Sequence, residues 1–119
     1  MIVKQCSVDT IDFDGLQIMD YTSKLDSRSS FAVITVSPGT AHAESWSKRS
    51  DKYYYVVSGR LEFTLDGQQQ VLSEGDFCVV PQGQHFSYSN RESNEAKICL
   101  VHTPCFDLNS EMFMKKSDG

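Results

Sequence analysis

The sequence has 119 residues, of which 39% are hydrophobic and 23% are charged, and its formal net charge is −5. This is the composition of one folded domain and excludes a chain that is disordered throughout, and the acidic balance argues against a nucleic-acid partner. No apolar run approaches the roughly 20 residues that cross a bilayer, and the first residues lack the apolar stretch of a secretory signal, so we expect a cytoplasmic protein with no membrane partner.

Short strands are predicted in chain order from residue 31 onward. Turn formers interrupt the chain every few residues, and the runs between them favour β-branched and aromatic residues. Asp66-Gly67 lies between two such runs, which is the strongest short-range hairpin signal. No helical repeat competes with this pattern, so the sequence predicts an all-β domain of seven to nine strands. The clearest strands are expected at residues 31–36, 53–57, 60–65, 68–72, 77–80 and 97–102.

The two ends of the chain are predicted to be less regular than this central part. A short strand is expected near Ile2-Val3, followed by a variable stretch and a polar loop at residues 23–30. Residues 110–119 are expected to form a mobile tail. The remaining residues, 1–109, are predicted to form a single domain, because the sequence shows no second domain and no internal repeat.

Two motifs, recognised by the spacing of their residues, resemble those of a known protein family. In residues 75–90, Gly75 is followed after five residues by Pro81, then by Gly83 and finally by Asn90. This spacing resembles the second conserved motif of the cupins, in which a metal-binding histidine stands where this chain has Phe86. The resemblance covers roughly residues 31–107 and implies a cupin-like double-stranded β-helix, which is a jelly-roll barrel, in a single domain.

The first cupin motif is also matched in its spacing, since Gly39 and Gly59 stand at its two ends. Its metal ligands are two histidines and a glutamate. In the register with a four-residue gap, the three ligand positions hold Ser45, Ser47 and Lys52. In the shorter register they hold Trp46, Lys48 and Lys52. Neither register supplies a histidine.

These substitutions predict a cupin that uses no metal and no cofactor. A catalytic metal in this fold would need imidazole and carboxylate ligands. Phe86 has no donor atom, and a protonated Lys52 repels a cation. We therefore expect the former metal position to be an organic pocket, and the alternative is a barrel filled by its own side chains.

Period-two alternation predicts which side chains line such a pocket. An aromatic interior with one or two ammonium groups favours a small anionic or carbonyl-bearing ligand, which is the only partner expected besides a second copy. Lys52 at the barrel rim and Trp46 as core filler remain alternatives. The predicted pocket residues are Trp46, Lys48, Lys52, Tyr54, Phe86, Tyr88 and His102.

Two alternative functions stay open. The first is an isomerase, epimerase or lyase in which Lys52, a tyrosine and His102 transfer protons. The second is a metal-dependent cupin whose unusual ligands are drawn from His42, Glu44, His85 and His102. Against it, a His-x-Glu pair such as His42 and Glu44 is more often on a surface, and His85 is expected on the face opposite Phe86. The resemblance also implies a homodimer.

Overall fold

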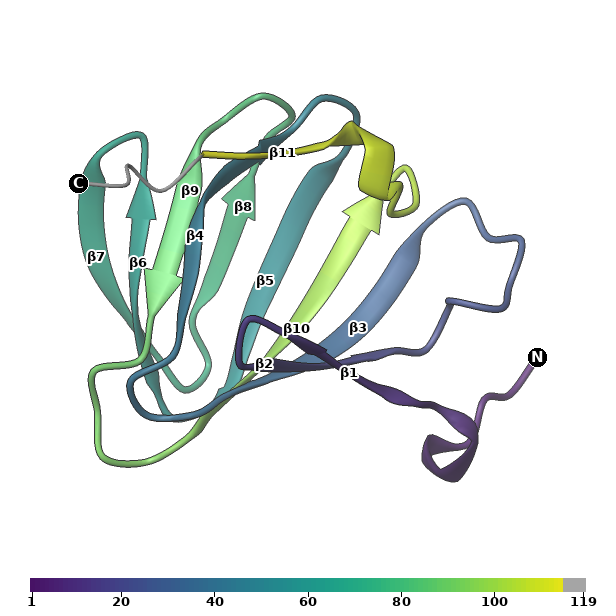
Figure 1. Ribbon diagram of the computed structural model, residues 1–119, viewed down its shortest axis with the longest axis horizontal. Coiled ribbons are helices and arrows are strands. Elements are labelled where there is room, and N and C mark those ends of the chain that lie inside the picture. The colour runs from purple at the N-terminus through teal and green to yellow at the C-terminus, as the bar shows by residue number, and fades with distance from the viewer. Residues whose placement is uncertain (115–119) are drawn as a thin grey trace.

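The computed structural model describes residues 1–114, and they form two antiparallel β-sheets that face each other (Figure 1). The six-stranded sheet contains, in spatial order, β1 (Thr10–Phe13), β2 (Leu16–Asp20), β3 (Ser30–Val36), β10 (Ala96–Thr103), β5 (Asp51–Ser58) and β8 (Phe77–Val80). The five-stranded sheet contains β11 (Glu111–Phe113), β4 (Ala41–Ser47), β9 (Phe86–Ser89), β6 (Arg60–Leu65) and β7 (Gln68–Ser73).

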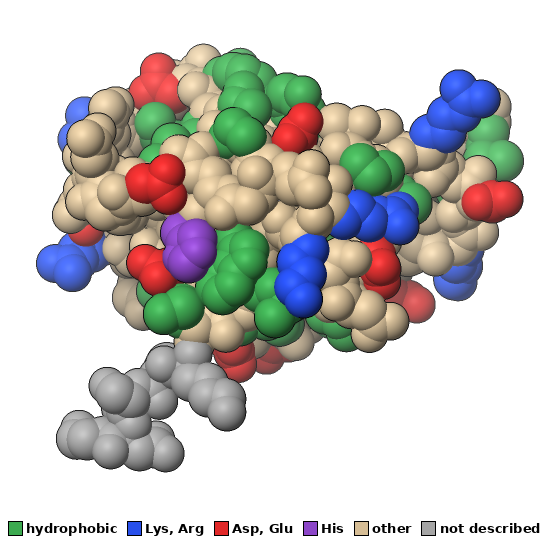
Figure 2. Space-filling view, turned by 90° about the horizontal axis from the view of Figure 1, so that it is seen from above, with side chains coloured by type: hydrophobic (Ala, Val, Ile, Leu, Met, Phe, Trp, Pro, Cys, Tyr) green, Lys and Arg blue, Asp and Glu red, His purple; other side chains and the backbone are tan. Residues whose placement is uncertain are grey.

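This architecture confirms the predicted all-β jelly roll, although the two sheets are not closed into one continuous barrel. Two short 3₁₀ helices, η1 (Gln5–Ser7) and η2 (Leu108–Ser110), are the helical elements between residues 1 and 114, and neither is long and apolar enough to cross a membrane. Seen from the end that β11 crosses, charges of both signs are scattered over the surface with hydrophobic side chains between them (Figure 2).

The core lies between the sheets and follows from period-two alternation along the strands. On β5, Lys52, Tyr54 and Val56 are buried, whereas the residues between them face outward to differing degrees. On β9, Phe86 and Tyr88 are buried in the same way. Burying one large apolar side chain stabilises a fold by about 1.5–3 kcal/mol, so these inner faces hold the sheets together.

Residues of the two cupin motifs that do not bind metal have structural roles here. A Cβ atom on Gly59 would lie 2.7 Å from Ala96 Cα, so only glycine lets β5 end against the start of β10. The Asn90 side chain is fully enclosed and donates hydrogen bonds to Val36 O (2.9 Å) and Asn94 O (2.8 Å). The motif spacing therefore identifies the scaffold of the fold.

The predicted hairpin is present at Asp66-Gly67, where β6 turns directly into β7. Both residues have positive φ, 46° for Asp66 and 83° for Gly67, and Leu65 pairs with Gln68 across the turn. This is the backbone geometry that a two-residue hairpin needs, and it explains why Asp-Gly occurs there.

Two predictions about the chain ends are wrong. The first strand begins at Thr10, and Ile2 and Val3 lie outside any strand. At the other end, residues 111–113 form β11, which pairs with the edge of β4 and crosses one end of the space between the sheets (Figure 1). Residues 111–113 are therefore a strand and not part of a tail, and the last part of the expected tail, residues 115–119, lies outside the described residues.

Candidate functional site

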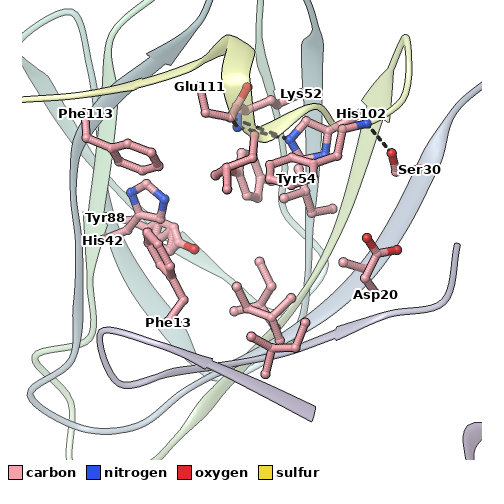
Figure 3. Close-up of a pocket in the computed structure, with 17 residues that line it drawn as sticks. Phe13, Asp20, Ser30, His42, Lys52, Tyr54, Tyr88, His102, Glu111 and Phe113 are labelled. Atoms are coloured by element: carbon pink, nitrogen blue, oxygen red, sulfur yellow. Dashed lines mark hydrogen bonds and ion pairs between the residues drawn. The ribbon is translucent and has the colours of Figure 1, made fainter. Parts of the chain in front are cut away.

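A cavity of about 300 Å³ lies between the two sheets (Figure 3). Apolar side chains from β1, β2, β3 and the segment before β11 form much of its wall. This open space favours a pocket over the alternative of a barrel filled by its own side chains. The polar and ionisable side chains that line it are Asp20, Ser30, His42, Lys52, Tyr54, Tyr88, His102 and Glu111.

One end of the cavity, the charged end, is built from Lys52, His102 and Glu111. The Lys52 ammonium forms an ion pair with Glu111 Oε1, and both side chains are only 5% exposed. Lys52 Nζ also donates a hydrogen bond to His102 Nε2 at 3.0 Å and lies 5.1 Å from the centroid of the Phe86 ring. Because Nε2 accepts from an ammonium, His102 is a neutral imidazole in this arrangement.

The protonation of the charged end follows from burial and from these contacts. Burial lowers the pKa of Lys52, and the charge of Glu111 opposes that effect. For Glu111, burial would raise the pKa, but the contacts of its carboxylate at the charged end outweigh burial and lower the pKa to about 2. Burial also lowers the pKa of His102. The ion pair and the hydrogen bond at this end are those of an ammonium, a carboxylate and a neutral ring.

The other end of the cavity, the aromatic end, is centred on His42. The imidazole ring lies 5.1 Å from the ring centroids of both Phe86 and Tyr88. Nδ1 lies 2.7 Å from Ala43 O, and a hydrogen bond donated there leaves the lone pair of Nε2 free. Burial lowers the pKa of His42 to about 4, so this ring is neutral at pH 7 and able to accept a proton.

Two buried oxygen atoms of the cavity lack a hydrogen-bond partner among residues 1–114. They are Tyr88 Oη and Glu111 Oε2. Leaving a buried polar atom unpaired costs about 1–3 kcal/mol. Burial raises the pKa of Tyr88, so its hydroxyl stays protonated and can donate. These two atoms are the positions at which a polar group of a ligand would find an open partner.

The structure brings some of the predicted pocket residues together and leaves others out. Lys52, Tyr54, Tyr88 and His102 line the cavity, and Phe86 is packed behind Lys52 and His42. Trp46 and Lys48 do not line it. The inward-facing residues of β4 are instead Ser45 and Ser47, which are 2% and 3% exposed, so the four-residue register of the first motif is the one that applies.

A bulge in β4 explains why His42 was not expected in the pocket. The pairing of β4 with β9 shifts register between His42 and Ser45. Such a bulge inserts an extra residue, so His42 and Ser45 both point inward although three positions separate them. A strict alternation rule cannot find His42 from the sequence. Glu111 and Phe113 were missed for another reason, since they belong to a segment that resembled a polar tail.

Of the four residues considered for an unusual metal site, two line the cavity and two lie outside it. His42 and His102 line the cavity, whereas Glu44 and His85 are exposed and contact each other at 3.4 Å. His85 is stacked on Trp46 with ring centroids 4.2 Å apart. Within residues 1–114, no three His, Cys, Asp or Glu side chains are grouped so that they could hold a metal ion.

The positions at which the fold family would hold a metal do not fit one here. Phe86 has no donor atom, and the Lys52 ammonium is already paired with Glu111. The Ser47 hydroxyl accepts hydrogen bonds from the backbone N–H groups of Ser50 (2.9 Å) and Arg49 (3.2 Å), which is a turn contact. The groups present at these positions therefore do not suit a transition metal.

Solved structures share the fold over almost the whole chain. The nucleoside dehydratase Pac13 superposes with a TM-score of 0.82 at 21% identity, covering 99% of this chain and 96% of that one. A Streptomyces Pac13 variant solved with uridine gives a TM-score of 0.84, also at 21% identity, with coverage of 96% and 90%. KdgF from Halomonas gives 0.79 at 21% identity, covering 90% and 96%. At this identity the likeness concerns the fold alone.

The proteins with similar sequences match a smaller part of this chain than the solved structures do. The tetracenomycin polyketide synthase protein TcmJ of Streptomyces glaucescens is 28% identical over 71 residues, which are 60% of this chain and 48% of TcmJ. The chain thus spans about half of that relative. An uncharacterized protein of Aquifex aeolicus is 26% identical over 85 residues, which are 71% of this chain and 69% of that protein. The family model described as "Cupin domain" matches residues 32–102. With that match over more than half of its length, the chain belongs to the cupin family.

Proposed function

We propose that this cupin binds a small organic molecule in the cavity between its two sheets, without a metal at the motif positions. The observation that carries the proposal is a hollow, mostly apolar space with a few convergent polar atoms, among them the unpartnered Tyr88 Oη. Sites of this kind, from about 300 to 1,000 Å³, are typical of small-molecule binding. The volume found here is at the small end of that range, which favours a single ring with its substituents.

The similar structures indicate which compounds to test first. Pac13 is described as a nucleoside dehydratase and was solved with uridine in variants that replace a histidine or one of two tyrosines. The cavity of this chain likewise has His42, Tyr54 and Tyr88 in its wall. Uridine is therefore the first probe, followed by other nucleosides, sugars and small carboxylates.

A thermal-shift screen of protein treated with EDTA tests the proposal. Uridine or another compound of the panel is expected to raise the unfolding midpoint by several degrees at a concentration far above its dissociation constant. Ala32→Phe is the control, because Ala32 lines the cavity and a larger side chain there fills it. The proposal would be contradicted by a panel without any effect, by equal effects on the filled variant, or by stoichiometric transition metal bound at Ser45, Ser47 and Lys52.

A second candidate function is acid–base catalysis of the lyase, isomerase or epimerase type. It is favoured by one observation, the neutral His42 ring with a free Nε2 lone pair at the cavity wall. A base of this kind can take a proton from a carbon or oxygen atom of a bound molecule, while the Tyr88 hydroxyl donates a hydrogen bond to it. This assigns the base to His42 rather than to Lys52 or His102, whose polar atoms contact each other.

Proton exchange distinguishes this enzyme from a simple binding protein. A bound compound incubated in D₂O should gain deuterium at one carbon, as followed by NMR, and His42→Gln should abolish the gain while the compound still binds. If the wild-type protein binds its ligand and exchanges no proton, the catalytic proposal fails and the binding proposal stands.

A further inference from the structure

We propose that Glu111 makes the cavity selective for neutral ligands, because its carboxylate is paired with the ammonium group of Lys52, which would otherwise attract an anion. The inference rests on the proposed function, since it concerns which class of molecule enters the same site. The sequence predicts an anionic or a carbonyl-bearing ligand, and this inference keeps the neutral carbonyl-bearing compounds and sets aside the anionic ones.

The contacts of Lys52 within residues 1–114 already satisfy much of its hydrogen-bonding capacity and neutralise its charge. An ammonium group has three N–H donors. One faces Glu111 Oε1 in the ion pair, and a second is donated to His102 Nε2 at 3.0 Å. The ammonium also lies 5.1 Å from the centre of the Phe86 ring, which is a favourable cation–π position. A ligand carboxylate at Lys52 would therefore have to compete with the carboxylate of Glu111.

The other charge at the cavity also disfavours an anion. Asp20 lines the cavity wall and keeps its place by accepting hydrogen bonds from the N–H (2.8 Å) and the hydroxyl (2.7 Å) of Thr22. Among residues 1–114, two carboxylates thus line the space against one ammonium. Charges inside a protein interact through a lower dielectric constant than in water, so this excess of negative charge repels an anion that enters the cavity.

Glu111 is supplied by a part of the chain that is distant from Lys52 in sequence. The two residues are 59 positions apart, and Glu111 is held in place by the pairing of β11 with β4, where it lies opposite Ser47. Figure 3 shows its side chain pointing toward Lys52 and His102. In effect the chain binds its own carboxylate at a position that a ligand carboxylate would otherwise take.

Chemical rescue tests this assignment. Glu111→Ala leaves Lys52 buried without a counter-ion and opens a space beside it, which acetate can enter. Acetate, compared with chloride at the same ionic strength, should raise the unfolding midpoint of this variant by roughly 5 °C and that of the wild-type protein by less than about 1 °C. The double variant Lys52→Met with Glu111→Ala should not respond, because it lacks the ammonium.

Glu111→Gln serves as a second variant, since it keeps the shape of the side chain and removes only the charge. By equilibrium titration it should bind acetate at least tenfold more tightly than the wild-type protein does. The inference is overturned if acetate raises the wild-type midpoint as much as that of Glu111→Ala, or if the response persists without Lys52. It is equally overturned if neither variant of Glu111 gains affinity for acetate.

The outcomes separate this inference from the proposed function. If no neutral compound binds the wild-type protein while acetate still rescues Glu111→Ala, the proposed ligand site is wrong and the charge compensation stands. If uridine or a sugar binds and acetate binds the wild-type protein equally well, the ligand site stands and the selectivity is wrong.

Discussion

The two ends of the cavity differ in how their polar atoms are used. At the charged end, Lys52, His102 and Glu111 contact one another, and Glu111 Oε2 is the oxygen left unpaired there within residues 1–114. At the aromatic end, the described part of the chain offers the Tyr88 hydroxyl no partner, and the hydrogen bond of His42 Nδ1 leaves the Nε2 lone pair for a ligand. From this difference we expect that the charged end stabilises the fold and that the aromatic end binds the ligand.

The largest effect is expected when the charged end is broken. Lys52→Met leaves the Glu111 carboxylate buried without its partner, so the free energy of unfolding should fall by about 3–5 kcal/mol. Chemical denaturation measures this loss. The double variant Lys52→Met with Glu111→Gln carries no buried charge and should recover much of the stability. A loss below about 1 kcal/mol for Lys52→Met would show that the charged end does not stabilise the fold.

The next largest effect is a pH dependence at the aromatic end. The pKa of His42 is lowered from 6.5 to about 4 by burial, so below pH 6.5 the unfolded chain binds a proton that the folded protein does not. The contribution of His42 is fully present above pH 6.5 and is lost as the pH falls toward 4, by up to about 3 kcal/mol. Denaturation curves across this range should show a smaller loss for His42→Gln. Identical pH slopes for both proteins would contradict the buried neutral ring.

Removing the unpartnered hydroxyl should separate stability from binding. Tyr88→Phe deletes a buried oxygen that makes no hydrogen bond within residues 1–114, so the free energy of unfolding should stay the same or rise by about 1 kcal/mol. Affinity for a ligand that uses this hydroxyl should fall about tenfold, as measured by calorimetry. A marked loss of stability, with affinity unchanged, would assign Tyr88 to the scaffold instead.

The smallest effect is expected outside the cavity. Trp46 is stacked on His85 and does not line the space. Trp46→Ala should therefore leave the ligand affinity within about twofold of the wild-type value. Calorimetry with the same ligand checks this, and a tenfold loss would return Trp46 to the binding site in which the sequence placed it.

Much of the fold could be predicted because local rules determine it. Alternation identified the inner faces of β5 and β9, and the Asp66-Gly67 turn fixed one hairpin. The motif glycines and Asn90 pointed to the family through close packing and hydrogen bonds that only those residues make. The prediction of where regular structure begins and ends in the chain was wrong. The pairing of residues 111–113 with β4 depends on contacts far apart in sequence.

The candidate site was predictable only in part, for the same reason. Lys52, Tyr54, Tyr88 and His102 lie on regular strands, so their direction follows from the pattern. His42 lies before a bulge, and nothing in the local sequence reveals that the register changes there. The partner of Lys52 was the more serious omission, because the ion pair with Glu111 is the observation on which we propose a neutral ligand.

The most direct test of the account is an NMR titration of EDTA-treated protein with uridine, observing aromatic and methyl signals. We predict saturable shifts of the His42, Tyr88 and Ala32 signals, which come from the cavity wall, with the Trp46 signals unchanged. Shifts confined to Trp46 and other surface residues, or binding that appears only after a transition metal is added, would contradict the claim that the cavity itself is the ligand site.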